Sequence, residues 1–144
     1  MSLRFDRRMK EQDAMQMNAL QLAYIGDAVW ELIVRHDLAV RGYNVHHMHR
    51  SCVDQVNAHS QAMILQSIKE LMTETEAEIV RRGRNAHPKH PAPRNQNPDE
   101  YAASTGFEAL LGYLYLTGSD SRIRELVKHI REVNSHVGTE KTEG

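Results

Sequence analysis

Three acidic side chains stand within apolar segments of the chain, at positions where their carboxylates could act together. Asp27 and Glu31 are four residues apart, so on a helix they share one face. Glu108 stands in a second apolar segment, within a stripe of mostly small residues. If the two segments pack through these faces, Asp27 and Glu108 converge into an oxygen site suited to Mg²⁺, which keeps several waters and can also hold a phosphate oxygen.

Two glycines mark where these segments could meet. Gly26 and Gly112 each cost a helix about 1 kcal/mol relative to alanine, so close approach of another backbone or of a ligand explains them better than chance. On spacing alone, a plain buried contact between helices is a simpler explanation than a metal site. For Asp27 and Glu31, the alternative is a solvated stripe on an amphipathic helix, although apolar neighbours flank the two acids.

The other residues with metal-binding or catalytic potential lack a supporting pattern. His46, His47 and His49 lie where a loop is expected to enter a helix, and without a defined partner set they are better explained as solvated histidines. Cys52 is the only cysteine, which excludes an internal disulfide and a thiolate zinc site and favours a reducing, cytoplasmic setting. The chain has neither a G-x-S-x-G nucleophile motif nor a phosphate-binding glycine loop.

Helical periodicity and end signals predict an all-α fold that must position these acids. The first helix is expected from Ala14 to Arg41, with Leu22, Ile25, Val29 and Ile33 on its buried side. Two shorter helices are expected within residues 49–71, with a break near 57–60. A further helix should begin at a Thr73–Glu76 capping box and end near Gly83. The last two are expected over Pro98–Leu116, where Asn97 is the capping residue, and from Ser119 or Asp120 to Gly138.

Basic charge is concentrated between residues 79 and 98, a segment without acidic residues that also carries all four prolines. This predicts a long basic loop that attracts anions. A solvated excursion of the chain is the alternative. The residues in and beside this loop that could contact an anion, such as an RNA phosphate, are Arg81, Arg82, Arg84, Asn85, Lys89 and Arg94.

Length and composition bound the remaining possibilities. The chain has 144 residues and a mass of 16.5 kDa, which predicts one domain over residues 1–144. Apolar residues make up 40% of it and charged residues 26%, so global disorder is excluded. No apolar run approaches the ~20 residues of a membrane helix, and residues 1–13 are charged rather than signal-like, so membrane insertion and secretion are not expected.

Two motifs resemble a known enzyme family. Residues 22–28, Leu-Ala-Tyr-Ile-Gly-Asp-Ala, resemble the signature helix of the ribonuclease III endonuclease domain, and residues 107–112, Phe-Glu-Ala-Leu-Leu-Gly, resemble its second acidic helix. The chain, roughly from Met15 to Val137, looks like one such domain without an appended module for binding double-stranded RNA. That layout, together with Arg-Gly-Arg-Asn-Ala at residues 82–86, resembles the bacterial Mini-III ribonucleases.

This resemblance implies a helical homodimer that cleaves double-stranded RNA, with one acidic site per subunit. Asp27 and Glu108 would hold Mg²⁺, for which Mn²⁺ could substitute, with Glu31 as a further candidate ligand. Hydrolysis would leave a 3′-hydroxyl and a 5′-phosphate. The family's usual task is maturation of the precursor of 23S ribosomal RNA in the large subunit, which adds a large-subunit ribosomal protein as a candidate partner.

The chain also departs from the pattern of the larger ribonuclease III enzymes. Two of their four usual acids are replaced here by Ala23 and Thr105, a departure that the Mini-III enzymes share. The same replacements would suit a catalytically silent relative that only binds double-stranded RNA. A third possibility is a plain helical dimerisation module, which should bind neither Mg²⁺ nor RNA.

Overall fold

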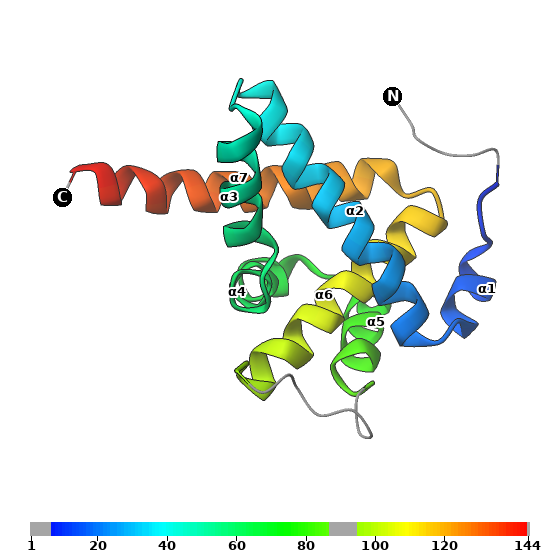
Figure 1. Cartoon of the computed structure of the whole chain (residues 1–144). Coiled ribbons are helices and arrows are strands. Elements are labelled where there is room, and N and C mark those ends of the chain that lie inside the picture. The colour runs from blue at the N-terminus through cyan, green and yellow to red at the C-terminus, as the bar shows by residue number, and fades with distance from the viewer. Residues whose placement is uncertain (1–6, 87–94, 144) are drawn as a thin grey trace.

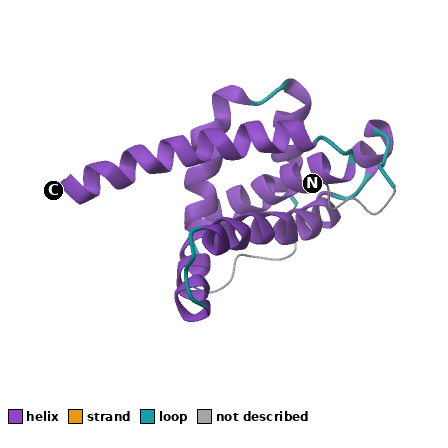
Figure 2. Cartoon of the chain, turned by 90° about the horizontal axis from the view of Figure 1, so that it is seen from above, coloured by secondary structure: helices purple, strands orange, loops and turns teal. Residues whose placement is uncertain are grey.

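The computed structural model of the chain describes residues 7–86 and 95–143, with side chains through residue 134. These residues form seven α-helices and one 3₁₀ turn, without a strand, as the all-α prediction requires (Figures 1 and 2). The elements are α1 Glu11–Gln16, α2 Ala19–Val40, α3 Val45–Val56, α4 Ala58–Ile68, η1 Lys69–Leu71, α5 Glu74–Arg84, α6 Pro98–Leu116 and α7 Asp120–Glu143.

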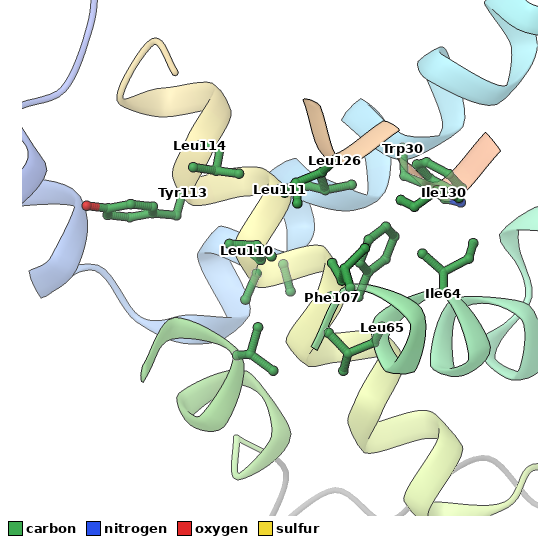
Figure 3. Close-up of a cluster of buried hydrophobic side chains, with 14 of the residues drawn as sticks. Trp30, Ile64, Leu65, Phe107, Leu110, Leu111, Tyr113, Leu114, Leu126 and Ile130 are labelled. Carbon is green, nitrogen blue, oxygen red and sulfur yellow. The ribbon is translucent and has the colours of Figure 1, made fainter. Parts of the chain in front are cut away.

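Helix α6 is the centre of the molecule, and α2, α4 and α5 pack around it (Figure 1). Phe107 and Leu110 of α6 are fully buried, in a cluster that α2, α4 and α7 complete (Figure 3). Trp30 of α2 meets Phe107 edge to face, with ring centroids 5.2 Å apart and planes at 82°. Because α6 is covered on most sides, residues 103–107 are all buried, including two hydroxyl side chains.

Local capping signals place several helix ends where the sequence predicts them. The Asn97 side chain accepts hydrogen bonds from the backbone N–H groups of Asp99 and Glu100, and Pro98 opens α6, so the predicted bounds of this helix are confirmed. The predicted capping box at the start of α5 is also present. Asn57 separates α3 from α4 by capping the latter.

Other predicted bounds are wrong. The first helix is interrupted at Met17, and α2 begins after Asn18, whose side chain accepts a hydrogen bond from the backbone N–H of Leu20. Helix α3 begins at Val45 rather than His49, because Asn44 caps it. The last helix continues past Gly138 to Glu143. The basic segment is not one loop, because residues 79–84 complete α5; residues 87–94 lie outside the described part.

The buried side of α2 also differs from the predicted one. Ala23, Gly26 and Trp30 face the core with Leu22, whereas Ile25, Val29 and Ile33 are only half-buried. The buried face of α2 is rotated from the predicted one because its small residues let α6 approach closely. A prediction based on the spacing of large apolar side chains does not detect such a contact.

Helix α5 is also joined to α7 by an ion pair whose carboxylate is buried. Glu76 accepts two hydrogen bonds of 2.8 Å from Arg122, whose Nη2 also donates to the Leu71 carbonyl. Burial would raise the pKa of Glu76, but its hydrogen bonds with Arg122 and Thr73 keep that pKa below its ordinary value. None of the helices described here is long and apolar enough to cross a membrane.

Candidate active site

Helices α2 and α6 cross so closely that only glycine fits at the contact. A Cβ atom built at Gly26 would lie 1.6 Å from the carbonyl oxygen of Glu108, and one at Gly112 would lie 1.9 Å from the carbonyl oxygen of Leu22. Real Cβ atoms essentially never approach other atoms closer than 3.0 Å. The prediction that backbones approach each other at Gly26 and Gly112 is therefore confirmed.

This crossing brings Asp27 and Glu108 together, because each acid lies beside or at the glycine contact. Their side chains share a hydrogen bond. Asp27 is exposed and Glu108 is half-buried, so the pair lies at the edge of the helix contact rather than inside the core. The prediction that these two carboxyl groups converge is confirmed, while their catalytic role stays a prediction.

The environment raises the pKa of Glu108 to about 8. Burial is the largest cause, followed by the hydrogen bond with Asp27 and then by the negative charge of Asp27. In the absence of a cation, the Glu108 carboxyl group therefore keeps its proton at neutral pH and donates a hydrogen bond to Asp27. A divalent cation held by Asp27 and Glu108 would stabilise both carboxylates in their ionised form and so lower the pKa of Glu108.

The donor set fits Mg²⁺ with an incomplete protein coordination shell. The two carboxylates would supply hard oxygen ligands, and because Asp27 is exposed, water would reach the other coordination positions. Among the described residues, there is no group of three or more His, Cys, Asp or Glu side chains that could hold a metal ion.

Other acidic and histidine candidates are engaged elsewhere or lie apart. Glu31, one turn beyond Asp27, accepts a hydrogen bond from Arg35 on the same helix. His46, His47 and His49 are exposed on α3, where the His47 ring stacks on Tyr43 with centroids 4.1 Å apart.

The two positions that depart from the larger enzymes are buried next to the acidic pair. Ala23 lies in the contact between α2 and the core, and Thr105 is 5% exposed on α6. The hydroxyl of Thr105 donates to the Tyr101 carbonyl at 3.1 Å, and the neighbouring Ser104 hydroxyl donates to the same carbonyl at 2.8 Å. Both hydroxyls therefore satisfy backbone within α6, as is usual for Ser and Thr in helices.

The candidate RNA-binding residues separate into several environments. Arg81 is paired with Glu78 on α5, whereas Arg82 donates to the carbonyls of Met15 and Met17. Asn85 is the C-cap residue that directly follows α5. Lys89 and Arg94 lie outside the described residues.

Arg84 lines a groove of about 440 Å³ between α4, α5 and α6. Arg81 and Lys69 line the same groove, and Lys69 is a basic residue that the sequence analysis missed because it is 15 positions before Arg84. Asp99 and Glu100 of α6 line the groove as well. The groove therefore places cations from two separate elements together.

A second glycine crossing also escaped the sequence analysis. A Cβ atom at Gly83 of α5 would lie 2.7 Å from the Cα of Gly106, and one at Gly106 would lie 2.8 Å from the Val80 carbonyl oxygen. The signal was available, since Gly106 interrupts a predicted helix just as Gly112 does. The second crossing fixes α5 against the helix that carries Glu108.

The raised pKa of Glu108 predicts how stability depends on pH in the metal-free protein. Below its ordinary pKa of 4.5, Glu108 is protonated in both the folded and the unfolded chain. As the pH rises toward 8, the unfolded chain loses this proton first, so the contribution of Glu108 to the free energy of unfolding falls. Chemical denaturation from pH 4 to 9 should show a weaker decline for Glu108→Gln, and identical curves would contradict the prediction.

The part of the chain that contains the α2–α6 crossing matches a known protein family. Residues 20–119 match the model of the Ribonuclease III domain. The chain is 51% identical to a Mini-ribonuclease 3 of Symbiobacterium thermophilum, over 76% of this chain and 84% of that protein. It is 42% identical to a Mini-ribonuclease 3 of a Synechococcus species, over 89% of this chain and 91% of that protein. A Mini-ribonuclease 3 of Clostridium tetani is 35% identical over 93% of this chain and 88% of its own length.

A solved structure shares the arrangement of the helices. The crystal structure of a Fusobacterium nucleatum protein superposes with a TM-score of 0.74 and 28% sequence identity, covering 83% of this chain and 95% of that one. The segment matched by the family model includes both Asp27 and Glu108.

Proposed function

The chain belongs to the ribonuclease III domain family and is one of its Mini-ribonuclease 3 endoribonucleases, and we propose that Asp27 and Glu108 form the catalytic site with which it cleaves double-stranded RNA. The observation that carries the proposal is the meeting of these two carboxyl groups at the Gly26–Gly112 crossing. Fixed helix positions of this kind keep catalytic groups in place better than loops do.

Asp27 and Glu108 are the residues that would hold Mg²⁺. When bound there, this ion supplies the positive charge that activates water and stabilises the leaving oxygen of the phosphodiester. Glu108 must give up its proton to bind a cation, so affinity should rise with pH up to about 8. Asp27, being exposed, is the member of the pair that can also face the substrate phosphate.

Incubation with a long, fully paired RNA tests the proposal directly. We expect cleavage in Mg²⁺ and in Mn²⁺, none in excess chelator, and products with 5′-phosphate and 3′-hydroxyl ends and short 3′ overhangs. The same sequence as single-stranded RNA is the control and should stay intact. Binding of the duplex without cleavage in either metal would instead establish the catalytically silent binder, for which Ala23 and Thr105 would be the reason.

Contacts with RNA phosphates are proposed for Arg81, Arg84 and Asn85, and for Lys89 and Arg94 beyond them. A-form RNA is recognised mainly through its shape, phosphates and 2′-hydroxyls, so a domain of this size needs basic contacts of its own. Arg84 and Lys69 support this assignment, because they place two cationic side chains from separate elements in one groove.

Neutralising Arg84 is expected to weaken duplex binding and to flatten its dependence on salt. Each lost phosphate contact lowers the slope of log K against log salt by about 1. Binding of wild-type and Arg84→Gln protein to a duplex over a series of salt concentrations, in chelator, measures this change. Arg124→Gln on α7 removes the same charge elsewhere, and equal slopes for the two variants would contradict the contact.

A homodimer is proposed because α2 presents an exposed apolar stripe beside the acidic pair. Tyr24 is 81% exposed and Leu32 is 51% exposed, with the exposed Ala28 between them. Exposed apolar patches of this kind mark interaction surfaces, and a second copy would cover this one and place two cleavage sites near one duplex. Sedimentation velocity tests it, and a monomer at the concentrations used for cleavage would exclude it.

The substrate that we propose is a paired stem in the precursor of 23S ribosomal RNA, with a large-subunit ribosomal protein as a candidate partner. Family membership supports this assignment. Cleavage of transcripts that carry the precursor stem, with and without the ribosomal protein, followed by mapping of the new ends, tests both parts. Random cutting along the stem in both conditions would contradict them.

A further inference from the structure

Arg82 belongs to the basic segment 79–98, yet its side chain is committed to the protein's own backbone. Its Nη1 donates to the Met15 carbonyl at 2.6 Å, and its Nη2 donates to the Met17 carbonyl at 2.7 Å. The side chain is half-buried and does not line the groove that holds Arg84. Its charge is therefore used differently from that of its neighbours in sequence.

The two carbonyls that Arg82 binds lie at the interruption between α1 and α2. Met15 is in the last turn of α1, and Met17 follows that helix in an extended conformation, with φ −67° and ψ 149°. Carbonyl groups at a helix end have no partner within the helix. A guanidinium suits this place because it presents several N–H donors in a fixed plane, whereas a lysine ammonium is a single compact donor group.

Arg82 makes the third of three contacts that link α2, α5 and α6 to one another. Helix α2 is fixed on α6 at the crossing of Gly26 with Gly112, and α5 is fixed on α6 at Gly83, the residue after Arg82. The guanidinium then joins α5 to the turn just before Asn18, the capping residue of α2. Helix α2 runs without a break from Ala19 past Asp27, so a shift at the start of α2 also moves Asp27.

We propose that Arg82 is a positioning residue for catalysis, which sets where Asp27 meets Glu108, and that it does not bind RNA. This inference rests on the proposed catalytic role of these two acids. A helix that shifts by one residue moves by about 1.5 Å and turns by about 100°. Misplacement of a reacting group by about 1 Å can cost on the order of 10²-fold in rate.

Arg82→Lys separates positioning from RNA binding, because it keeps the charge and removes the paired donors. A phosphate contact tolerates lysine, since lysine binds phosphate as a point charge. The positioning role does not tolerate lysine, because lysine cannot bind both carbonyls in the same way. We therefore expect kcat to fall by about tenfold or more while KM and duplex affinity stay unchanged. Binding of Mn²⁺ without RNA, measured by electron paramagnetic resonance, should weaken as well. Arg124→Lys is the matched control and should leave both kcat and the affinity for Mn²⁺ unchanged.

Circular dichroism at the assay temperature gives the folded fraction, and kcat is expressed per folded molecule. A purely stabilising role would leave that normalised kcat and the Mn²⁺ affinity at wild-type values, and this result would overturn the inference. Loss of duplex affinity in Arg82→Gln, restored in Arg82→Lys, would overturn it too. Asp27→Asn is assayed in parallel: if it cleaves normally, the proposed site is wrong, whereas its inactivity beside a fully active Arg82→Lys refutes the role of Arg82 alone.

Discussion

Asp27→Asn is expected to lower the rate of duplex cleavage by at least about 10³-fold. Asparagine keeps the shape of the side chain and a hydrogen bond with Glu108, but it removes the negative charge on which cation binding depends. A catalytic metal contributes several kcal/mol of transition-state stabilisation, and every 1.36 kcal/mol is a factor of ten in rate. Because Asp27 is exposed, the fold should be unaffected. Single-turnover cleavage at saturating enzyme measures the chemical step without the contribution of binding.

The control for this prediction is another exposed aspartate. Asp54 lies on α3, where its backbone carbonyl accepts a hydrogen bond from the Ser60 hydroxyl and its side chain is exposed. Asp54→Asn should cleave at the wild-type rate, and both variants should bind the duplex as the wild type does. An Asp27→Asn rate within tenfold of wild type would show that the two carboxyl groups at the glycine crossing are not the catalytic site.

Much of the candidate site could be predicted from sequence because its determinants are local. Asp27 directly follows Gly26, Glu108 is one helical turn before Gly112, and the cost of glycine in a helix indicates a close contact. What could not be predicted is the direction of each charged side chain. Arg82 and Arg84 are two positions apart in one basic segment, yet Arg82 binds backbone near α2 and Arg84 lines the groove.

The same long-range contact accounts for an error in the predicted fold. Helices that begin at self-contained caps, such as α5 and α6, were predicted well because the capping residues are adjacent in sequence. The interruption at Met17 was missed, since apolar periodicity continues through it and the group that binds its carbonyls is Arg82, 65 residues later. Sequence patterns report local preferences, whereas this break is stabilised by tertiary structure.

Gly26→Ala should reverse the usual effect of replacing glycine in a helix. In an ordinary helix interior, this change stabilises by about 1 kcal/mol. Here the new methyl group would lie 1.6 Å from the Glu108 carbonyl oxygen and 2.9 Å from the Gly112 backbone nitrogen, both of which are backbone atoms that cannot rotate away. Helix α2 must move off α6, so we expect a loss of about 3 kcal/mol or more in the free energy of unfolding. Denaturant titration measures this loss.

The displacement should also abolish cleavage in the molecules that remain folded, because moving α2 away separates Asp27 from Glu108. Gly42→Ala provides the contrast: Gly42 has a φ of +82° and no atom within 4 Å of its built Cβ, so alanine there carries only the backbone strain of about 1–2 kcal/mol. That variant should keep wild-type cleavage per folded molecule. If Gly26→Ala is as stable and as active as wild type, the helices do not cross as closely as the two glycines require, and the geometry that joins the acids is wrong.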